Sequence, residues 1–323
     1  MIWASWRMHR TIYLVSIAIA AVLAIWLYIS GTLEASAWTS FTSHNCSPSY
    51  PGSSEACMAG LTGTGSFSTV NVWLCGSLPA ILGLVLGVPL VAGEIEQRTN
   101  RLAWTQSITK NRWLFSKIGV GATIVVGIVG AMAPMIWWWT DAARRSTHIQ
   151  PSNFDISGFV IVAYALFAFM LGVALGALIR RTGWAFAACI PVFVLVRFVV
   201  RLYVRPTLIS PTTRSTSVNA PISSVNWQLH SGFVPIGHSA PTASETWSSN
   251  SQVIQNCQGL NSNTGKPALS TAYCEKLHHL HYVLQYHPPS HFWSLQLAES
   301  AIFLGAALFL LGITVLAVRR WRT

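Results

Sequence analysis

The chain has 323 residues, of which 52% are hydrophobic and only 9% are charged. A soluble domain carries about 25% charged residues, so this composition excludes an ordinary soluble enzyme and indicates a polytopic membrane protein. The net charge is +11, but the basic residues flank apolar segments, which reflects membrane topology, and we expect no nucleic-acid partner.

Six apolar segments are long enough to cross a bilayer as helices, which takes roughly 20 residues. Each is continuous rather than alternating, which argues against barrel strands. The sequence therefore predicts an all-α integral membrane protein with six transmembrane helices, the first of which is retained rather than cleaved as a signal. The predicted spans are about 11–30, 70–92, 116–139, 157–179, 184–204 and 294–318.

The division of the chain follows these spans. Residues 1–204 hold five spans and a short N-terminal amphipathic helix, in which Trp3 and Trp6 adjoin Arg7 and Arg10, as in helices that lie on a membrane surface. The Ser/Thr/Gly-rich loop 31–69 is expected to be partly ordered. Residues 205–292 form an outer segment, and 293–323 form the sixth span with a basic tail.

The distribution of Lys and Arg orients the chain. Six spans place both termini on one side of the membrane. That side receives twelve of the twenty basic residues, at the two termini, in the loop 93–117 and in the turn 180–183. Because short cytoplasmic loops are enriched in Lys and Arg, we expect both termini in the cytoplasm.

The loop 93–117 is the most polar part of the cytoplasmic side, with the sequence GEIEQRTNRLAWTQSITKNRWLFSK. Glu94 and Glu96 are two of only nine acidic residues and directly follow a span. Acidic residues there do not help orientation, so we expect them to cap a helix start or to meet a basic partner surface. A merely solvated loop is the alternative.

The outer segment 205–292 is rich in Ser, Thr and Pro in its first half. Later, Tyr273, Leu277, Leu280 and Leu284 follow helical spacing, which predicts one amphipathic helix in a small cap rather than a catalytic domain.

Four cysteines lie in the outer segments, which suits an oxidising compartment. Four cysteines allow three pairings; we favour Cys46 with Cys57 and Cys257 with Cys274, each pair within one loop. Two further cysteines lie inside spans and are interpreted as packing residues.

Charged residues inside the spans are costly and are usually paired or functional. Arg197, Arg201 and Arg205 recur every four residues and so share one helix face. Glu299 lies at a comparable depth in the sixth span. We therefore predict that Glu299 pairs with Arg197 or Arg201; the alternative is that each side chain extends separately to the membrane surface.

Glycines lie four residues apart in two spans, at Gly83 and Gly87 and at Gly172 and Gly176. Small residues at this spacing permit close helix approach. Packing within the chain is the expected use, and a dimer interface is the alternative.

Motifs of catalysis are missing from the sequence. There is no GxxxxGK[ST] nucleotide loop, no HExxH and no CxxC, and no nucleophile–base constellation is visible. We expect no enzymatic activity, no nucleotide site and no metal site in this chain. Five histidines of the outer segment lie close in sequence, but beyond Cys274 and Glu275 no cysteine or carboxylate forms a recognisable ligand set with them. They are interpreted as surface residues (His278, His279, His281, His287 and His291).

The loop pattern resembles the segment between the second and third helices of bacterial ABC exporter permeases of the type-2 class. It reads Glu94-x-Glu96-x-x-Thr99-x-x-Leu102-x-x-Thr105-Gln106-Ser107-x-Thr109-Lys110-x-Arg112-Trp113-x-x-x-Lys117. The stretch from Tyr286 to Glu299 resembles the start of the last helix in one subfamily, and Arg201-x-x-x-Arg205-Pro206 fits as well. The resemblance covers most of the chain.

This resemblance implies a permease subunit in a bacterial plasma membrane, paired with a second copy or a related permease and with separate ATPase subunits that bind ATP and Mg. The loop would contain a coupling helix seated on the ATPase, shaped by Glu94, Glu96, Thr99, Arg112 and Trp113. Two other readings stay open. They are an ion-coupled secondary transporter, for which midplane carboxylates would be expected, and a membrane-anchored sensor or immunity protein.

Overall fold

The computed structural model describes residues 2–43, 55–97, 109–141, 148–215, 226–236, 244–259 and 269–320. Six of its helices are long and apolar enough to cross a membrane. With helix dominating the structure, the prediction of an all-α integral membrane protein with six spans is confirmed. These helices are α1 (Ile2–Ser43), α2 (Glu55–Glu96), α4 (Lys110–Trp139), α6 (Val160–Ile179), α7 (Thr182–Val199) and α10 (Phe292–Arg319).

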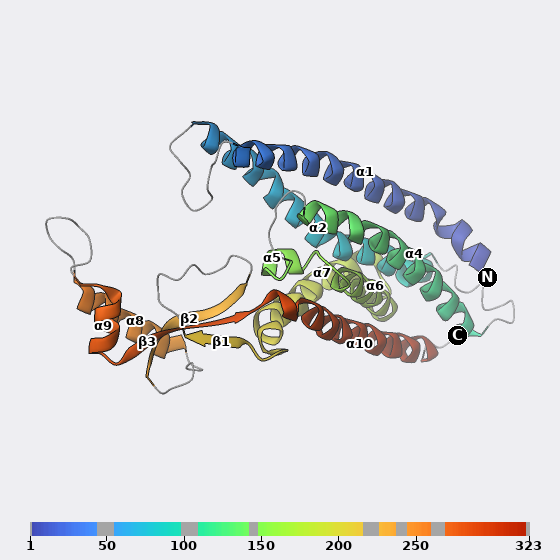
Figure 1. Ribbon diagram of the computed structural model, residues 1–323. Coiled ribbons are helices and arrows are strands. Elements are labelled where there is room, and N and C mark those ends of the chain that lie inside the picture. The colour runs from blue at the N-terminus through green and yellow to red at the C-terminus, as the bar shows by residue number, and fades with distance from the viewer. Residues whose placement is uncertain are drawn as a thin grey trace.

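The first two helices are longer than the sequence predicts. Residues 2–9 do not form a separate interfacial helix but continue into α1 without a break in the helical backbone. At the other end α1 runs to Ser43, and α2 begins at Glu55, so much of the loop 31–69 is helical. Figure 1 shows these two extensions running side by side past the rest of the bundle. Apolar span length sets a minimum for each helix, and polar residues can prolong it beyond the hydrocarbon.

The centre of the bundle is α6, in which 83% of the most apolar window is buried, against 22% in α1, α7 and α10. The glycines of α2 and α6 explain how closely α6 is held. A Cβ added to Gly87 would come within 2.3 Å of the Phe169 carbonyl oxygen, and one added to Gly172 within 2.9 Å of the Val88 backbone nitrogen. The small residues therefore serve packing within the chain, where the two backbones nearly touch.

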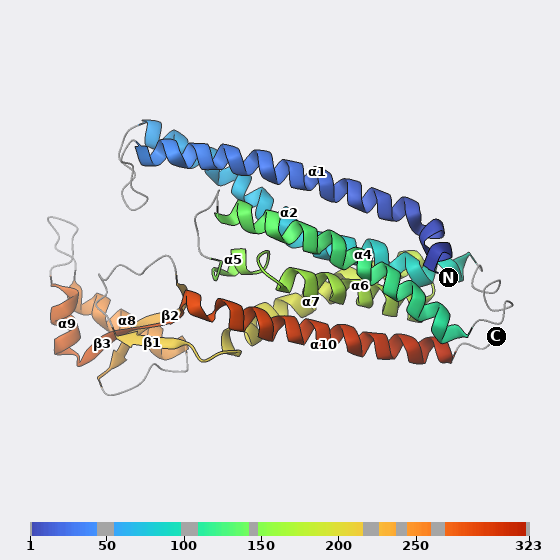
Figure 2. The same cartoon turned by 45° about the vertical axis from the view of Figure 1, so that its right-hand side comes forward.

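Both chain termini lie at one end of the bundle, and a small β-sheet lies beyond the other (Figure 2). We call these the terminal end and the sheet end. At the sheet end, α7 continues into a π-helical turn, Val200–Val204, and a 3₁₀ turn, Arg205–Thr207. The short helix α5 (Pro151–Phe154) lies in the connection between α4 and α6.

The sheet is antiparallel, with strand order β1-β3-β2. Its strands are β1 (Thr212–Ser215), β2 (Trp227–Pro235) and β3 (Leu280–His287), and it is accompanied by α8 (Ser244–Gln258) and α9 (Thr271–Leu277). The predicted amphipathic helix is therefore wrong in its second half. The left-handed backbone of His279 (φ 52°) separates α9 from β3, and Leu280 and Leu284 are buried on the strand while Tyr273 and Leu277 are exposed on α9.

The cap carries a disulfide bond between Cys257 of α8 and Cys274 of α9. It closes a separation of 17 residues and fastens the two helices beside the sheet. The other favoured pair falls outside the described part of the chain: Cys46 lies between α1 and α2, and the side chain of Cys57, in α2, is also not described.

Candidate functional site

Polar side chains gather at each end of the bundle. At the terminal end, Glu94 of α2 accepts a hydrogen bond from the ammonium group of Lys117 on α4. Both side chains are only 6% exposed. The ammonium group also lies 5.0 Å from the ring centre of Trp113, over its face. Because a buried ion pair is costly to break, this contact fixes α2 against α4 next to the loop that joins them.

The second glutamate reaches a different helix. One carboxylate oxygen of Glu96, Oε2, accepts hydrogen bonds from the backbone N–H of Thr182 (3.2 Å) and from its hydroxyl (2.7 Å). Thr182 is the first residue of α7, so the carboxylate binds where helical N–H groups lack partners and the helix dipole favours negative charge. We call Glu94, Lys117, Glu96 and Thr182 the double bracket.

The double bracket changes the interpretation of the loop residues. Of the two uses expected for the glutamates, Glu96 takes the first, capping a helix start. Glu94 is 5% exposed and faces Lys117 of its own chain, and Trp113 is 2% exposed within the bundle. Arg112 is exposed. Thr99 lies outside the described residues. Of the described residues expected to meet a partner, Glu94 and Trp113 are thus buried supports, whereas Glu96 and Arg112 are exposed.

At the sheet end, Arg205 lies at the centre of a buried ion cluster with 1% of its side chain exposed. Its Nε donates to Glu299 Oε2 (2.7 Å), and its Nη2 donates to Glu299 Oε1 (2.9 Å) and to Asp155 Oδ1. The Tyr164 hydroxyl lies 3.1 Å from Nη2 and donates to Glu299 Oε1 (2.6 Å). This bidentate guanidinium–carboxylate pair joins the 3₁₀ turn after α7 to α10, and Tyr164 adds α6 to the contact.

The other carboxylate of the cluster holds two further arginines. Asp155 Oδ2 lies 3.4 Å from Arg197 Nη2 and 3.3 Å from Arg201 Nη1. Burial alone would raise the pKa of Asp155, but the three guanidinium groups outweigh burial and hold this pKa below its ordinary value. We call Asp155, Tyr164, Arg197, Arg201, Arg205 and Glu299 the arginine cluster.

The pairing predicted for Glu299 differs from the one observed. Its partner is Arg205 rather than Arg197 or Arg201, which lie against Asp155. The helical spacing that placed the three arginines on one face assumes a regular α-helix. The π-helical turn Val200–Val204 adds a residue to the turn and so re-aims Arg205.

Asp155 was missed because it lies in the connection before α6, where a carboxylate is ordinarily solvated. That connection is held in the bundle by Gln296 of α10. The Gln296 amide accepts from the N–H of Val160 (3.0 Å) and donates to the carbonyl oxygens of Phe154 and Ser157. Gly158 has a left-handed φ of 74°, and a Cβ there would come within 2.8 Å of Gln296 Oε1. No pattern in the sequence signals this contact.

A histidine of the connection between α4 and α6 packs against α4. His148 stacks on Trp137 with ring centres 3.7 Å apart, and its two ring nitrogens lie near Asp141 (2.9 Å) and Ser157 (3.2 Å). Burial lowers the pKa of His148, although Asp141 acts in the opposite direction.

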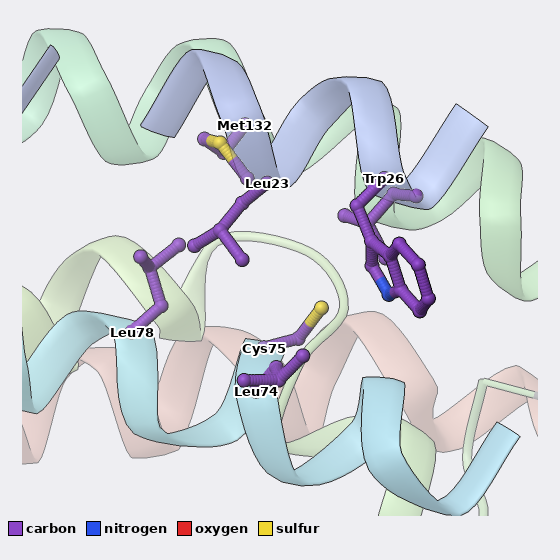
Figure 3. Close-up of a pocket in the computed structure, with 7 residues that line it drawn as sticks. Leu23, Trp26, Leu74, Cys75, Leu78 and Met132 are labelled. Carbon is purple, nitrogen blue, oxygen red and sulfur yellow. The ribbon is translucent and has the colours of Figure 1, made fainter. Parts of the chain in front are cut away.

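Figure 3 shows a small cavity between α1, α2 and α4. Its volume is about 10 Å³, which is close to the minimum for one water molecule, and its lining is apolar. It is therefore a gap in packing and no ligand site. The lining residues are Leu23, Trp26, Leu27, Leu74, Cys75, Leu78 and Met132.

Comparison with known families bears on this arrangement. The family described as "ABC-2 membrane transporter related" matches residues 17–205, which is more than half of the chain. The chain belongs to this family. No curated protein and no solved structure matches the chain with significance.

The match begins in α1 and ends at Arg205, so it includes the whole double bracket and five of the six residues of the arginine cluster. As a member of the ABC-2 family, the chain is a multi-pass membrane component of an ABC transporter, a class of system that includes an ATPase partner. This membership confirms the resemblance to type-2 permeases drawn from the sequence.

Proposed function

We propose that the chain is the permease subunit of an ATP-driven exporter, and that the loop 98–108 is the contact with a separate ATPase. The observation that carries this proposal is the double bracket. It fastens the last turn of α2, which leads directly into the loop, to two different spanning helices, α4 and α7.

Such an arrangement would convert displacement of the loop into displacement of spans. Through the Glu94–Lys117 pair, α4 would follow α2. Through the Glu96–Thr182 contact, α7 would follow as well. The two helices differ modestly in burial, with 22% of the apolar window buried in α7 and 33% in α4. We infer that α7 is the helix that moves in response to the ATPase.

The orientation proposed here places the terminal end in the cytoplasm of a bacterial plasma membrane. Support comes from the enrichment of basic residues at the termini and near the loops of that end. A second permease copy, or a related permease, would complete the transport path. The exposed apolar side chains of α7 and α2, such as Leu195 and Trp73, are available for that contact or for lipid.

The test is coexpression with a candidate ABC ATPase and measurement of both copurification and ATP hydrolysis. Arg112→Glu, on the exposed residue next to the loop, is expected to reduce copurification, because it reverses a charge at the proposed contact. The matched control is Arg214→Glu, an exposed arginine of β1 at the opposite end. Equal copurification of both variants would refute the contact at this loop.

A further inference from the structure

The arginine cluster holds more donors than its carboxylates can accept. Each guanidinium offers about five N–H groups. The two carboxylates together present two Glu299 oxygens, both bound by Arg205, and two Asp155 oxygens, of which Oδ2 is shared by Arg197 and Arg201. Three arginines against two carboxylates leave the cluster with one excess positive charge.

Within the described part of the chain, unused donors are found on Arg205 and Arg201. Among the described residues, Nη1 of the buried Arg205 has no hydrogen-bond partner. Arg201 has a single contact to the cluster, at 3.3 Å, and its side chain is 47% exposed. Arg197 is 17% exposed, and apart from Asp155 its guanidinium lies over the Tyr164 ring (4.0 Å) and donates to the Gly76 carbonyl of α2 (3.4 Å).

The surroundings of Arg201 are apolar on the exposed side. Val194 and Phe198 lie seven and three residues before it, on the same side of α7, and are 58% and 56% exposed. A ligand that met the free N–H groups of Arg201 would therefore lie along a hydrocarbon surface. A small hydrated anion gains nothing from such a surface, whereas the acyl chain of an amphiphile does.

We propose that Arg201, supported by Arg197, binds the acidic head group of an amphiphile, a phosphate or carboxylate attached to a hydrocarbon chain. Asp155 holds the guanidinium groups of Arg197 and Arg201 close together. Arg205, which is paired with Glu299, donates to the other oxygen of Asp155 and so holds that carboxylate in place. An incoming oxyanion would accept planar, charge-assisted hydrogen bonds from Arg201 and balance the excess charge of the cluster.

The experiment uses the purified full chain in a neutral detergent. Binding is titrated with short-chain phosphatidylglycerol, with phosphatidylcholine of the same chain length, and with inorganic phosphate. We expect phosphatidylglycerol to bind more tightly than the other two probes. Arg201→Gln should weaken its binding about tenfold or more, as expected for loss of a charge-assisted contact. Arg201→Lys should show an intermediate loss, since it keeps the charge without the planar fork.

The control variant is Arg214→Gln, which removes the same charge from an exposed site in the cap and should leave binding unchanged. Equal weakening by both variants would show an effect of net charge and overturn the site. Inorganic phosphate binding as tightly as phosphatidylglycerol would overturn the assignment to an amphiphile, and so would equal binding of phosphatidylcholine. Binding is measured on the chain alone, so the result does not depend on whether an ATPase copurifies.

Discussion

The Glu96–Thr182 contact of the double bracket and the arginine cluster hold opposite ends of α7 through carboxylates, but they are built differently. At the terminal end, the exposed carboxylate of Glu96 accepts two hydrogen bonds from one residue, Thr182. At the sheet end, six side chains share contacts, and Arg205 is 1% exposed. The comparison shows how a loosely packed spanning helix is positioned: α7 is anchored firmly at one end by a network and lightly at the other by a cap.

This difference has a mechanical consequence. A buried network resists rearrangement because each carboxylate has several partners, and breaking one contact leaves a charge uncompensated. A capping contact exposed to water can break and re-form at little cost. We therefore expect the terminal end of α7 to move and its sheet end to act as the pivot.

The largest effect is expected from breaking the cluster. Glu299→Leu leaves Arg205 buried without its bidentate partner and should destabilise the fold by about 3–5 kcal/mol, the range for removing one member of a buried ion pair. Thermal unfolding in detergent measures it. Arg205→Met combined with Glu299→Leu should be less harmful than Glu299→Leu alone, since the uncompensated charge is gone. A double variant as unstable as the sum of both single variants would show that the pair is not coupled.

The next effect concerns Glu94 and Lys117, which are both 6% exposed. Lys117→Met strands a carboxylate between α2 and α4 and should lower stability by roughly 3 kcal/mol. Glu94→Gln combined with Lys117→Met should recover most of this loss. If Lys117→Met alone leaves the melting temperature unchanged, the Glu94–Lys117 pair does not hold α2 to α4, and this part of the double bracket is refuted.

A functional rather than a stability effect is expected from Glu96. Glu96→Gln keeps the size of the side chain but removes its charge from the start of α7, and Thr182→Val removes the hydroxyl donor. Both should leave the melting temperature nearly unchanged while weakening the coupling between an associated ATPase and transport. Transport per ATP hydrolysed is the measurement. A fall in stability with intact coupling would make the contact structural only.

The smallest effect is the pH dependence of the sheet end. His287, interpreted from the sequence as a surface residue, is instead buried in the structure. Burial lowers the pKa of both His148 and His287. Because each pKa is lower in the folded chain, the unfolded chain binds protons at a higher pH as the pH falls. Stability from these groups is therefore fully present above the ordinary histidine pKa of about 6.5 and falls as the pH drops below it.

His148→Gln should flatten the change in melting temperature between about pH 7.5 and 5.5, a window that brackets the ordinary histidine pKa. His278→Gln, on an exposed residue just after α9, is the control. If the melting temperature of the His148 variant changes with pH as steeply as that of the wild type, burial of His148 does not contribute to the pH dependence of stability.

The sequence predicted the spans well because their signal is redundant: about 20 apolar residues must be helical in a membrane whatever they pack against. The prediction was wrong for the second half of the amphipathic helix, where helical and strand periodicities place the same residues on one face. Leu280 and Leu284 are four apart, which suits a helix face but also one face of a strand, and the left-handed backbone at His279 decided between them.

The charged sites were predicted in part. The sequence identified Glu94, Glu96, Arg197, Arg201, Arg205 and Glu299 as unusual, because charges beside or inside spans are few. It could not give their partners. Lys117 lies 23 residues from Glu94, and Thr182 lies 86 residues from Glu96. Asp155 reaches the arginine cluster from a connection that Gln296 of α10 holds by its carbonyl groups.

The central claim is that the loop after α2 drives α7 through Glu96. The most direct measurement is the distance between spin labels in the chain assembled with its ATPase, one at the terminal end of α7 and one on α6, compared between the nucleotide-free and ATP-trapped states. The account predicts a distance change in the wild type that Glu96→Gln largely abolishes, while an equivalent pair at the sheet end stays constant. A change of equal size with and without Glu96 would contradict it.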